Sequence, residues 1–304
     1  MNEHDRLVDR AARGARTVLF VGGLDAGKSS LARATAAFAL KIGRTVAYLD
    51  ADVGQKTVGP PATVGLKHIR GADDLTLDRL AEADVLGFVG SISPQDHLLP
   101  LVGALARLRD RARSEGADLL VVDTGGEVSG IWAQLVKYYE VDMLEPDLMV
   151  GLQRGEELEP IVGVIQRFFG IEILTAGIHP SVSPSSVEER MEQRERSMAR
   201  YFSGELSRFR VKPTVFMPTL PPMFDLSELD RLLVGLSDGE GGFTGVGYLE
   251  HVTNEDALRL VTPVAAAPKA LRLGSVRLEA TFRAKRVDRR NLFGTERKAE
   301  ACRR

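Results

Sequence analysis

A glycine-rich turn is the segment of this chain best suited to chemistry on phosphate. Residues 22–29 run Gly-Gly-Leu-Asp-Ala-Gly-Lys-Ser, which satisfies the pattern G-x-x-x-x-G-K-[ST] between a predicted strand and a predicted helix. Its glycines let backbone N–H groups curl around an anion, its lysine reaches the outer phosphates, and its hydroxyl meets magnesium. The motif predicts a bound nucleoside triphosphate with Mg²⁺. It does not decide whether the protein is an ATPase, a GTPase, a kinase or a switch. The expected nucleotide-binding residues are Gly22, Gly23, Leu24, Asp25, Ala26, Gly27, Lys28, Ser29, Ser30 and Gln55.

Two carboxylates follow the next apolar run. Asp50 and Asp52 stand at the end of residues 44–50, and Gln55 comes shortly after them. At the carboxyl end of a strand, one acid can orient magnesium through water while the other accepts the proton of an attacking hydroxyl. We expect both acids to border the phosphate site, with Ser29 and Asp52 as magnesium ligands and Gln55 positioning a hydroxyl or a water. The competing interpretation is ordinary turn chemistry, since Asp and Gly are common turn residues.

Two further acids are open to two interpretations each. Asp25 lies inside the glycine-rich turn, where phosphates repel a carboxylate unless it meets magnesium, water or a basic residue. It could equally cap a turn. Asp123 ends the apolar run 118–124 and precedes two glycines, as in the Asp-Thr-x-Gly turn of many phosphate-loop proteins, where the acid orients magnesium. The sequence does not choose between this role and a turn-forming one.

An arginine-rich helix is predicted over residues 185–202. Ser185 or Ser186, with a glutamate three residues later, forms a capping box at its start. Arg190 and Arg194 lie four residues apart and project from one face. This is either a solvated helix with Glu–Arg pairs or a segment that closes over the phosphate site and neutralises charge on a transferring phosphoryl group. The sequence alone does not decide.

The elements that must position these groups alternate along the chain. Apolar runs are separated by segments with helical spacing, which predicts an α/β fold with a parallel sheet covered by helices on both faces. Such sheets bind ligands at the carboxyl ends of their strands. Beyond residue 205, period-two alternation and closely spaced glycines predict a small β module. The apolar runs lie at residues 16–21, 44–50, 85–90, 118–124, 147–152 and 171–178.

Composition excludes several classes of protein. The chain has 304 residues, 44% of them hydrophobic and 27% charged, which exceeds one average domain and excludes a mainly disordered chain. No apolar run approaches the roughly 18 residues of a membrane span, and the polar first 16 residues lack the apolar core of a secretory signal. We therefore expect a cytoplasmic protein with no membrane partner. The single cysteine, Cys302, excludes an internal disulfide and a cysteine-based zinc site.

Charge is unevenly distributed. The net charge of −2 excludes a whole-molecule attraction for nucleic acid but leaves a local one open. Residues 205–304 carry 17 basic and 13 acidic side chains, and the segment from Arg283 onward carries nine basic and three acidic ones. This segment is either a solvated terminus or a surface that contacts phosphates.

Taken in order, these segments resemble the polynucleotide 5'-hydroxyl kinase family that includes the pre-mRNA cleavage complex subunit and its nucleolar and archaeal relatives. Residues 22–30 (GGLDAGKSS) are similar to the family's phosphate loop, residues 49–55 (LDADVGQ) to its Asp-x-Asp-x-Gly-Gln motif, and residues 189–204 to its arginine-rich lid. The resemblance implies a P-loop NTPase fold with a small C-terminal all-β domain. It implies that Lys28 and Ser29 bind phosphate and magnesium, that Asp50 or Asp52 is the general base, and that Arg190 and Arg194 are the lid arginines. The expected catalytic residues are thus Lys28, Asp50, Asp52, Arg190 and Arg194.

The implied organisation has four parts. We expect a leader at residues 1–15, a P-loop kinase domain at 16–205 that contains the helix 185–202, a β-rich domain at 206–285 and a basic tail at 286–304. Two segments depart from the family. Where the family has Thr-x-Gly-Trp, this chain has Thr-Gly-Gly-Glu at residues 124–127. Where the family has a clasp segment that bears Thr and Asn, this chain has Ser-Ile-Ser-Pro-Gln-Asp-His at residues 91–97. Both segments belong to the acceptor side in the family.

The expected function is transfer of the γ-phosphoryl group of ATP or GTP to the 5'-hydroxyl of an RNA or DNA end. Two alternatives stay open. One is a P-loop NTPase that acts as a nucleotide-dependent switch or assembly factor without kinase activity, and the other is a kinase of small molecules. The sequence identifies no protein partner.

Overall fold

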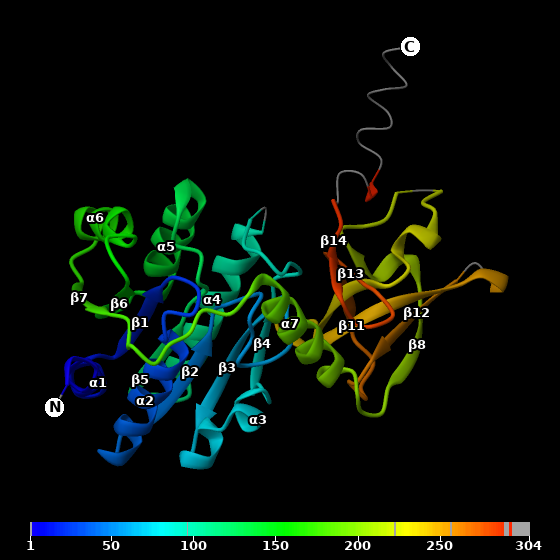
Figure 1. The fold of residues 1–304 in the computed structure, drawn as a ribbon. Helices are drawn as coiled ribbons and strands as arrows, with labels where there is room; N and C mark the ends of the chain where they lie inside the picture. The colour runs from blue at the N-terminus through cyan, green and yellow to red at the C-terminus, as the bar shows by residue number, and fades with distance from the viewer. Residues whose placement is uncertain (1, 96, 222, 256, 289–291, 294–304) are drawn as a thin grey trace, which may run out of the picture.

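The computed structural model describes residues 2–95, 97–221, 223–255, 257–288 and 292–293 (Figure 1). Cys302 and most of the expected basic tail, 286–304, lie outside the described residues. Within the described part of the chain, no helix is both long and apolar enough to cross a membrane.

A parallel sheet forms the centre of the N-terminal two thirds of the chain. Its strands lie in the order β2-β5-β1-β6-β7, and every neighbouring pair is parallel. The core strands are rich in Val, Leu and Ile, as expected for strands that are covered on both faces. This confirms the predicted α/β fold with a parallel sheet. The strands are β1 (Thr17–Gly22), β2 (Val46–Asp50), β5 (Leu119–Asp123), β6 (Leu148–Gln153) and β7 (Glu172–Gly177).

The sheet is not parallel throughout. A strand that the sequence did not predict, β3 (Thr63–Ile69), pairs antiparallel with β2 and with β4 (Val85–Phe88). The link from β2 to β3 contains no helix, and without a crossover the chain can only return antiparallel to its neighbour. The all-parallel expectation is therefore wrong at this edge.

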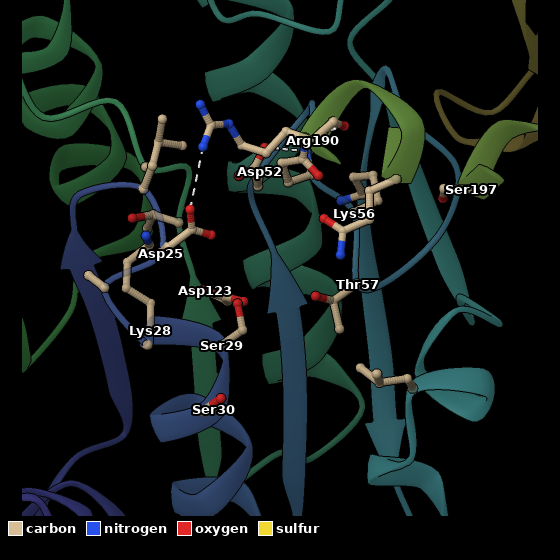
Figure 2. A pocket seen from close by; sticks show the side chains of 18 of the residues that line it. Asp25, Lys28, Ser29, Ser30, Asp52, Lys56, Thr57, Asp123, Arg190 and Ser197 are labelled. Atoms are coloured by element: carbon tan, nitrogen blue, oxygen red, sulfur yellow. Dashed lines mark hydrogen bonds and ion pairs between the residues drawn. The ribbon is translucent and has the colours of Figure 1, made fainter. Parts of the chain in front are cut away.

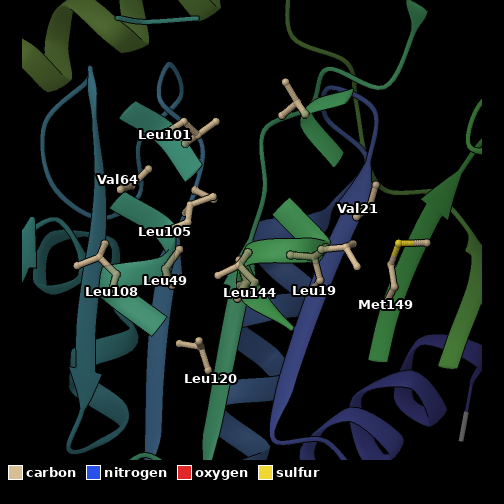
Figure 3. Close-up of a cluster of buried hydrophobic side chains, with 14 of the residues drawn as sticks. Leu19, Val21, Leu49, Val64, Leu101, Leu105, Leu108, Leu120, Leu144 and Met149 are labelled. Atoms are coloured by element: carbon tan, nitrogen blue, oxygen red, sulfur yellow. The ribbon is translucent and has the colours of Figure 1, made fainter. Parts of the chain in front are cut away.

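Side chains of β1 alternate between two buried clusters, one on each face of the sheet. Leu19 and Val21 belong to the cluster under α4, α5 and α6 (Figure 3), whereas Val18 and Phe20 belong to the cluster under α1 and α2. This alternation holds the sheet between two helical layers, as predicted. The helices are α1 (Glu3–Gly14), α2 (Lys28–Lys41), α3 (Leu77–Leu80), α4 (Leu98–Ser114), α5 (Gly130–Leu144), α6 (Glu159–Phe168) and α7 (Val187–Tyr201), with short 3-10 turns at Ala72–Leu75, Pro213–Val215, Leu226–Leu229 and Thr253–Glu255.

The first helix differs from the leader expected at residues 1–15. Asn2 and Asp5 form a capping box at its start, and Leu7, Ala11 and Ala12 are buried in the same cluster as α2. The segment has polar residues on one side and small apolar ones on the other, so it packs as an amphipathic helix. It is part of the P-loop core.

The C-terminal strands form the expected β module, and its pairings are antiparallel apart from β9 with β13. The module continues the central sheet, because Phe243 of β11 pairs with Leu86 of β4. Helix α7 lies between the two parts (Figure 1), and its Met198 and neighbouring Phe202 are buried against strands of the module. The strands are β8 (Ser207–Val211), β9 (Phe216–Met217), β10 (Leu232–Ser237), β11 (Phe243–Val252), β12 (Ala257–Thr262), β13 (Ala270–Leu278) and β14 (Ala284–Arg286).

Candidate active site

The glycine-rich turn joins β1 to α2, as the motif requires. Gly27 caps the helix at a φ of 91°, in the left-handed region where a side chain is disfavoured. Lys28 begins the helix and is only 7% exposed, and its Nζ donates a hydrogen bond of 2.8 Å to the carbonyl of Gly23. Burial lowers the pKa of Lys28, while nearby Asp123 opposes this effect. The turn therefore holds an ammonium group at the N-terminus of a helix, where anions bind.

A cavity of about 540 Å³ opens over this turn (Figure 2). Gly22 and Gly23 do not line it. A Cβ atom on Gly22 would lie 2.6 Å from the carbonyl oxygen of Leu152, so this glycine lets β1 approach β6 closely. The predicted residues that line the cavity are Leu24, Asp25, Ala26, Gly27, Lys28, Ser29, Ser30, Asp52, Gln55 and Arg190.

Asp50 does not face the cavity. Its side chain is 1% exposed, and its Oδ2 accepts backbone N–H bonds from Thr57 at 2.6 Å and Val58 at 2.8 Å. The same oxygen lies 3.0 Å from Nζ of Lys56. Burial raises the pKa of Asp50 to about 6, against the attraction of Lys56. The expectation that both acids border the phosphate site is thus wrong for Asp50, because the chain folds back and surrounds this carboxylate with donors.

Asp52 is the acid that faces the cavity. Its Oδ1 accepts N–H bonds from Gly54 at 2.7 Å and Gln55 at 2.9 Å, which fixes the side chain. Gln55 in turn donates from Nε2 to the carbonyl oxygen of Arg190 at 2.9 Å. The acidic loop is therefore tied to helix α7.

Asp123 is the site residue that the sequence left undecided. It ends β5 beside Asp50 in the strand register, lines the cavity with Ser29, and is 3% exposed. Tyr48 donates to its Oδ2 at 3.1 Å, while its buried Oδ1 has no hydrogen-bond partner among the described residues. A buried oxygen without a partner calls for an ion or water. A carboxylate beside a hydroxyl is the oxygen donor set that Mg²⁺ accepts together with substrate phosphates, so these residues fit the metal.

Helix α7 lies over the site. Ser186, one of the two predicted caps, forms the capping box with Glu189. Asp25 accepts a hydrogen bond of 2.8 Å from the backbone N–H of Ser185 and lies 3.4 Å from the Arg190 guanidinium. The carboxylate inside the glycine-rich turn thus meets a basic residue, as one interpretation of Asp25 required (Figure 2).

A second cavity, of about 180 Å³, lies on the other side of Asp52. It shares Asp52, Gln55 and Arg190 with the first cavity and adds Arg194, whose Nε donates to the carbonyl of Gly54 at 3.4 Å. Burial lowers the pKa of the Arg194 guanidinium, and Asp52 opposes this. The two predicted arginines therefore differ in position, since Arg190 lines both of these cavities whereas Arg194 lines only the smaller of the two.

The smaller cavity also contains a buried ion pair that the sequence did not indicate. Nζ of Lys137 donates to Oε2 of Glu140 and to the carbonyl of Gly125, both at 2.9 Å. Both side chains are 2% exposed, and burial raises the pKa of Glu140. Their i, i+3 spacing is that of an exposed helical pair, so only packing of α5 against the site could identify them.

Both departures from the family lie at this smaller cavity. Glu127, Ile92 and Pro94 contribute to its lining. Glu127 is exposed to solvent on one side, and its partial desolvation raises its pKa. The neighbouring Gly126 is required by close packing, because a Cβ there would lie 2.7–2.9 Å from atoms of Leu24. The turn after β5 thus forms a wall between the two cavities.

The arrangement can serve a transfer between two bound molecules. The larger cavity has the groups that bind phosphates, the smaller one is a separate space, and Asp52 and Arg190 line both. A carboxylate and a guanidinium at this junction can accept a proton and stabilise negative charge, respectively.

Known proteins are similar to this chain in sequence and in fold. The family model of the mRNA cleavage and polyadenylation factor CLP1 P-loop matches residues 22–204. A polyribonucleotide 5'-hydroxyl-kinase of Pyrococcus horikoshii is 28% identical, over 82% of this chain and 81% of that protein. One of Thermococcus kodakarensis is 26% identical, over 86% of this chain and 88% of that protein.

A chain in the structure of the wild-type Clp1p–Pcf11p complex has the same fold, with a TM-score of 0.68 at 17% identity over 90% of this chain and 77% of that one. The family match extends from the glycine-rich turn through the acidic loop to the end of helix α7, which is more than half of the chain. This chain therefore belongs to the mRNA cleavage and polyadenylation factor CLP1 P-loop family.

Proposed function

We propose that this protein is a polynucleotide 5'-hydroxyl kinase that transfers the γ-phosphoryl group of ATP to the 5'-hydroxyl end of RNA. The observation that carries the proposal is the junction of the two cavities at Asp52 and Arg190. A pure NTP hydrolase needs room for a water, whereas a second cavity of about 180 Å³ has room for part of a second substrate. The relatives named as polyribonucleotide 5'-hydroxyl-kinases support this choice of acceptor.

Each residue of the site has its own part in the proposed reaction. Lys28 and the N–H groups of the glycine-rich turn bind and orient the phosphates of ATP. The oxygen of the acceptor hydroxyl bonds to the γ-phosphorus, and Asp52 accepts the proton of that hydroxyl. At the same time the bond between the γ-phosphorus and the bridging β–γ oxygen breaks, and ADP leaves. Arg190 neutralises charge on the phosphoryl group in transit, and α7 excludes water from it.

Magnesium is assigned to the Ser29 and Asp123 side of the larger cavity. Ser29 and Asp123 would hold Mg²⁺, which supplies charge neutralisation to the β- and γ-phosphates when bound. This assignment moves the metal from the expected Asp52 to Asp123 and keeps Asp52 available for the proton. Ser29 retains its expected role.

The test is transfer of label from γ-labelled ATP to 5'-hydroxyl oligonucleotides. We expect the Lys28→Ala variant to lose about a thousandfold or more in rate, because the lysine stabilises transition-state charge. Lys41→Ala, at the exposed end of the same helix, is the matched control and should retain full rate. A 5'-phosphorylated oligonucleotide should accept nothing. Label that appears only as free phosphate in the wild type would refute the proposal.

One observation favours a second candidate, a nucleotide-dependent switch or assembly factor. Glu127 places a carboxylate in the smaller cavity, where a nucleic acid would bring negative phosphates. Under this alternative, a protein partner and not an oligonucleotide would change the rate of NTP turnover. Free nucleosides as acceptors test the small-molecule kinase in the same assay. Three points stay predictions from the sequence: that GTP can replace ATP as donor, that DNA can replace RNA as acceptor, and that the protein is cytoplasmic.

A further inference from the structure

A third hollow, of about 450 Å³, lies between helix α7 and the hairpin that joins β13 to β14. Basic side chains outnumber acidic ones in its lining, which makes the hollow attractive to anions. In the described part of the chain, neither Arg283 nor Lys285 forms an ion pair with a carboxylate. Its charged residues are Arg194, Glu195, Glu279, Arg283, Lys285 and Arg286.

The hollow continues from the smaller cavity. Arg194 lines both spaces, so one guanidinium connects them. Arg286 is close enough to Glu127 to lower the pKa of that carboxyl, against the larger effect of burial. The hairpin of the C-terminal module therefore lies within electrostatic range of the smaller cavity, and Arg194 is the residue that lines both spaces.

The hairpin has a fixed position relative to helix α7. Its Phe282 stacks on Phe202, which follows the helix, at a centroid distance of 5.3 Å and an interplanar angle of 8°. Arg231 lies over the same ring at 5.8 Å. Within the hairpin, the N–H of Glu279 donates to the carbonyl of Arg283 at 2.9 Å. The basic side chains are thus presented from a rigid support, which lowers the entropic cost of binding.

We propose that this hollow binds the sugar–phosphate backbone of the acceptor strand beyond its first nucleotide. The proposal rests on the proposed function, because the 5'-hydroxyl end occupies the smaller cavity and the strand continues past Arg194. Lys and Arg side chains that follow a strand contact its phosphates without reading its sequence. The ligand is a single-stranded polynucleotide, and the hollow gives longer strands an advantage over short ones.

The experiment compares a double variant, Arg283→Glu with Lys285→Glu, with the wild type on a 5'-hydroxyl 12-mer and a 5'-hydroxyl dinucleotide. Both side chains are exposed, so the changes leave the core intact. The matched control is Arg208→Glu with Lys212→Glu, which makes the same charge change at exposed positions of the C-terminal module outside the three cavities. Steady-state kinetics are measured at several salt concentrations, and anisotropy of a 3'-labelled 12-mer measures binding without turnover.

We expect KM for the 12-mer to rise on the order of tenfold, with kcat, KM for ATP and KM for the dinucleotide unchanged. The salt dependence of 12-mer binding should fall by about 1.4 in log–log slope, since each phosphate contact on a single strand contributes roughly 0.7. The control should match the wild type. An unchanged KM and salt slope in the double variant, or an equal loss in the control, overturns the proposal.

Failure of the proposed function gives a different result. If the wild type transfers no phosphate to any oligonucleotide, the proposed kinase activity is refuted. The anisotropy measurement then tests by itself whether the hollow binds a strand. Weaker 12-mer binding in the double variant but not in the control then supports a strand-binding surface. Equal binding in all three proteins overturns it.

Discussion

The two cavities of this site differ in how the chain builds them. The larger cavity has one continuous lining segment, residues 24–30, which we propose as its phosphate-binding part, and further lining residues between positions 52 and 200. The smaller cavity is assembled from short pieces of seven separate segments, at residues 24, 51–55, 92–94, 101, 125–127, 136–140 and 190–194. The proposed phosphate-binding turn is therefore local in the sequence, whereas the proposed acceptor cavity depends throughout on the fold.

This difference has a consequence for substitutions. A change in the glycine-rich turn acts on the phosphates directly, because the binding groups are neighbours in sequence. A change in any one of the segments that line the smaller cavity alters part of a wall that the others also form. We therefore expect substitutions in the smaller cavity to change the use of the acceptor with little effect on the nucleotide, and the following experiments test that contrast.

The largest expected effect is at the junction of the cavities. Asp52→Asn removes the proton acceptor, and we expect kcat to fall by about a thousandfold, the middle of the range for general-base catalysis. KM for ATP and the melting temperature should change little. Single-turnover transfer to a 5'-hydroxyl oligonucleotide is the measurement, with Asp110→Asn, which lines neither cavity, as control. A kcat within threefold of the wild type would remove Asp52 from the mechanism.

Asp50 should behave in the opposite way to Asp52. Asp50→Ala leaves the N–H groups of Asp52, Thr57 and Val58 without their acceptor. It also removes the carboxylate beside the ammonium of Lys56, which keeps only its hydrogen bond to the carbonyl of residue 50. The free energy of unfolding should drop by about 3 kcal/mol, the lower end for a broken buried pair. Urea unfolding followed by circular dichroism measures it, and Asp50→Asn, which keeps one oxygen, should lose less. A stable protein with lost kcat would instead make Asp50 a catalytic residue.

Glu127 provides a pH test of the acceptor side. Since burial raises the pKa of Glu127, this side chain gains its proton at a higher pH than an ordinary glutamate as the solution is acidified. Its negative charge repels strand phosphates, so KM for the acceptor should fall with falling pH in the wild type. Glu127→Gln should have a lower acceptor KM, by about fivefold for roughly 1 kcal/mol of repulsion, and no such pH dependence. An altered KM for ATP with an unaltered acceptor KM would place Glu127 on the donor side.

An effect of about the same size is expected at the contact between the acidic loop and helix α7. Gln55→Ala deletes the hydrogen bond to the carbonyl of Arg190, a loss of about 1 kcal/mol. We expect kcat/KM for the acceptor to fall about fivefold, since both residues line the smaller cavity. Gln166→Ala, on an exposed position of α6, is the control. An identical kcat/KM in the Gln55 variant would show that α7 holds its position without this bond.

Sequence patterns predicted the parts of the fold that depend on neighbouring residues. The strands of the parallel sheet, the glycine-rich turn and the capped helix α7 all form near their expected positions. Strand β3 was missed because its residues have no helix before them and its direction depends on pairing with β2. Lys137 and Glu140 of the smaller cavity had no signal in the sequence, since an i, i+3 Lys–Glu pair is common on exposed helices.

The sequence by itself determined a phosphate-binding turn, because that turn is made by hydrogen bonds and dihedral angles within a few residues. Only the tertiary structure decided which acid faces the phosphates. Asp50 and Asp52 are equivalent in type and adjacent to the same strand, but one is surrounded by the returning chain and the other is directed into the cavity. The physical reason is that the environment of a carboxylate depends on segments distant in sequence, which burial and sheet register bring to it.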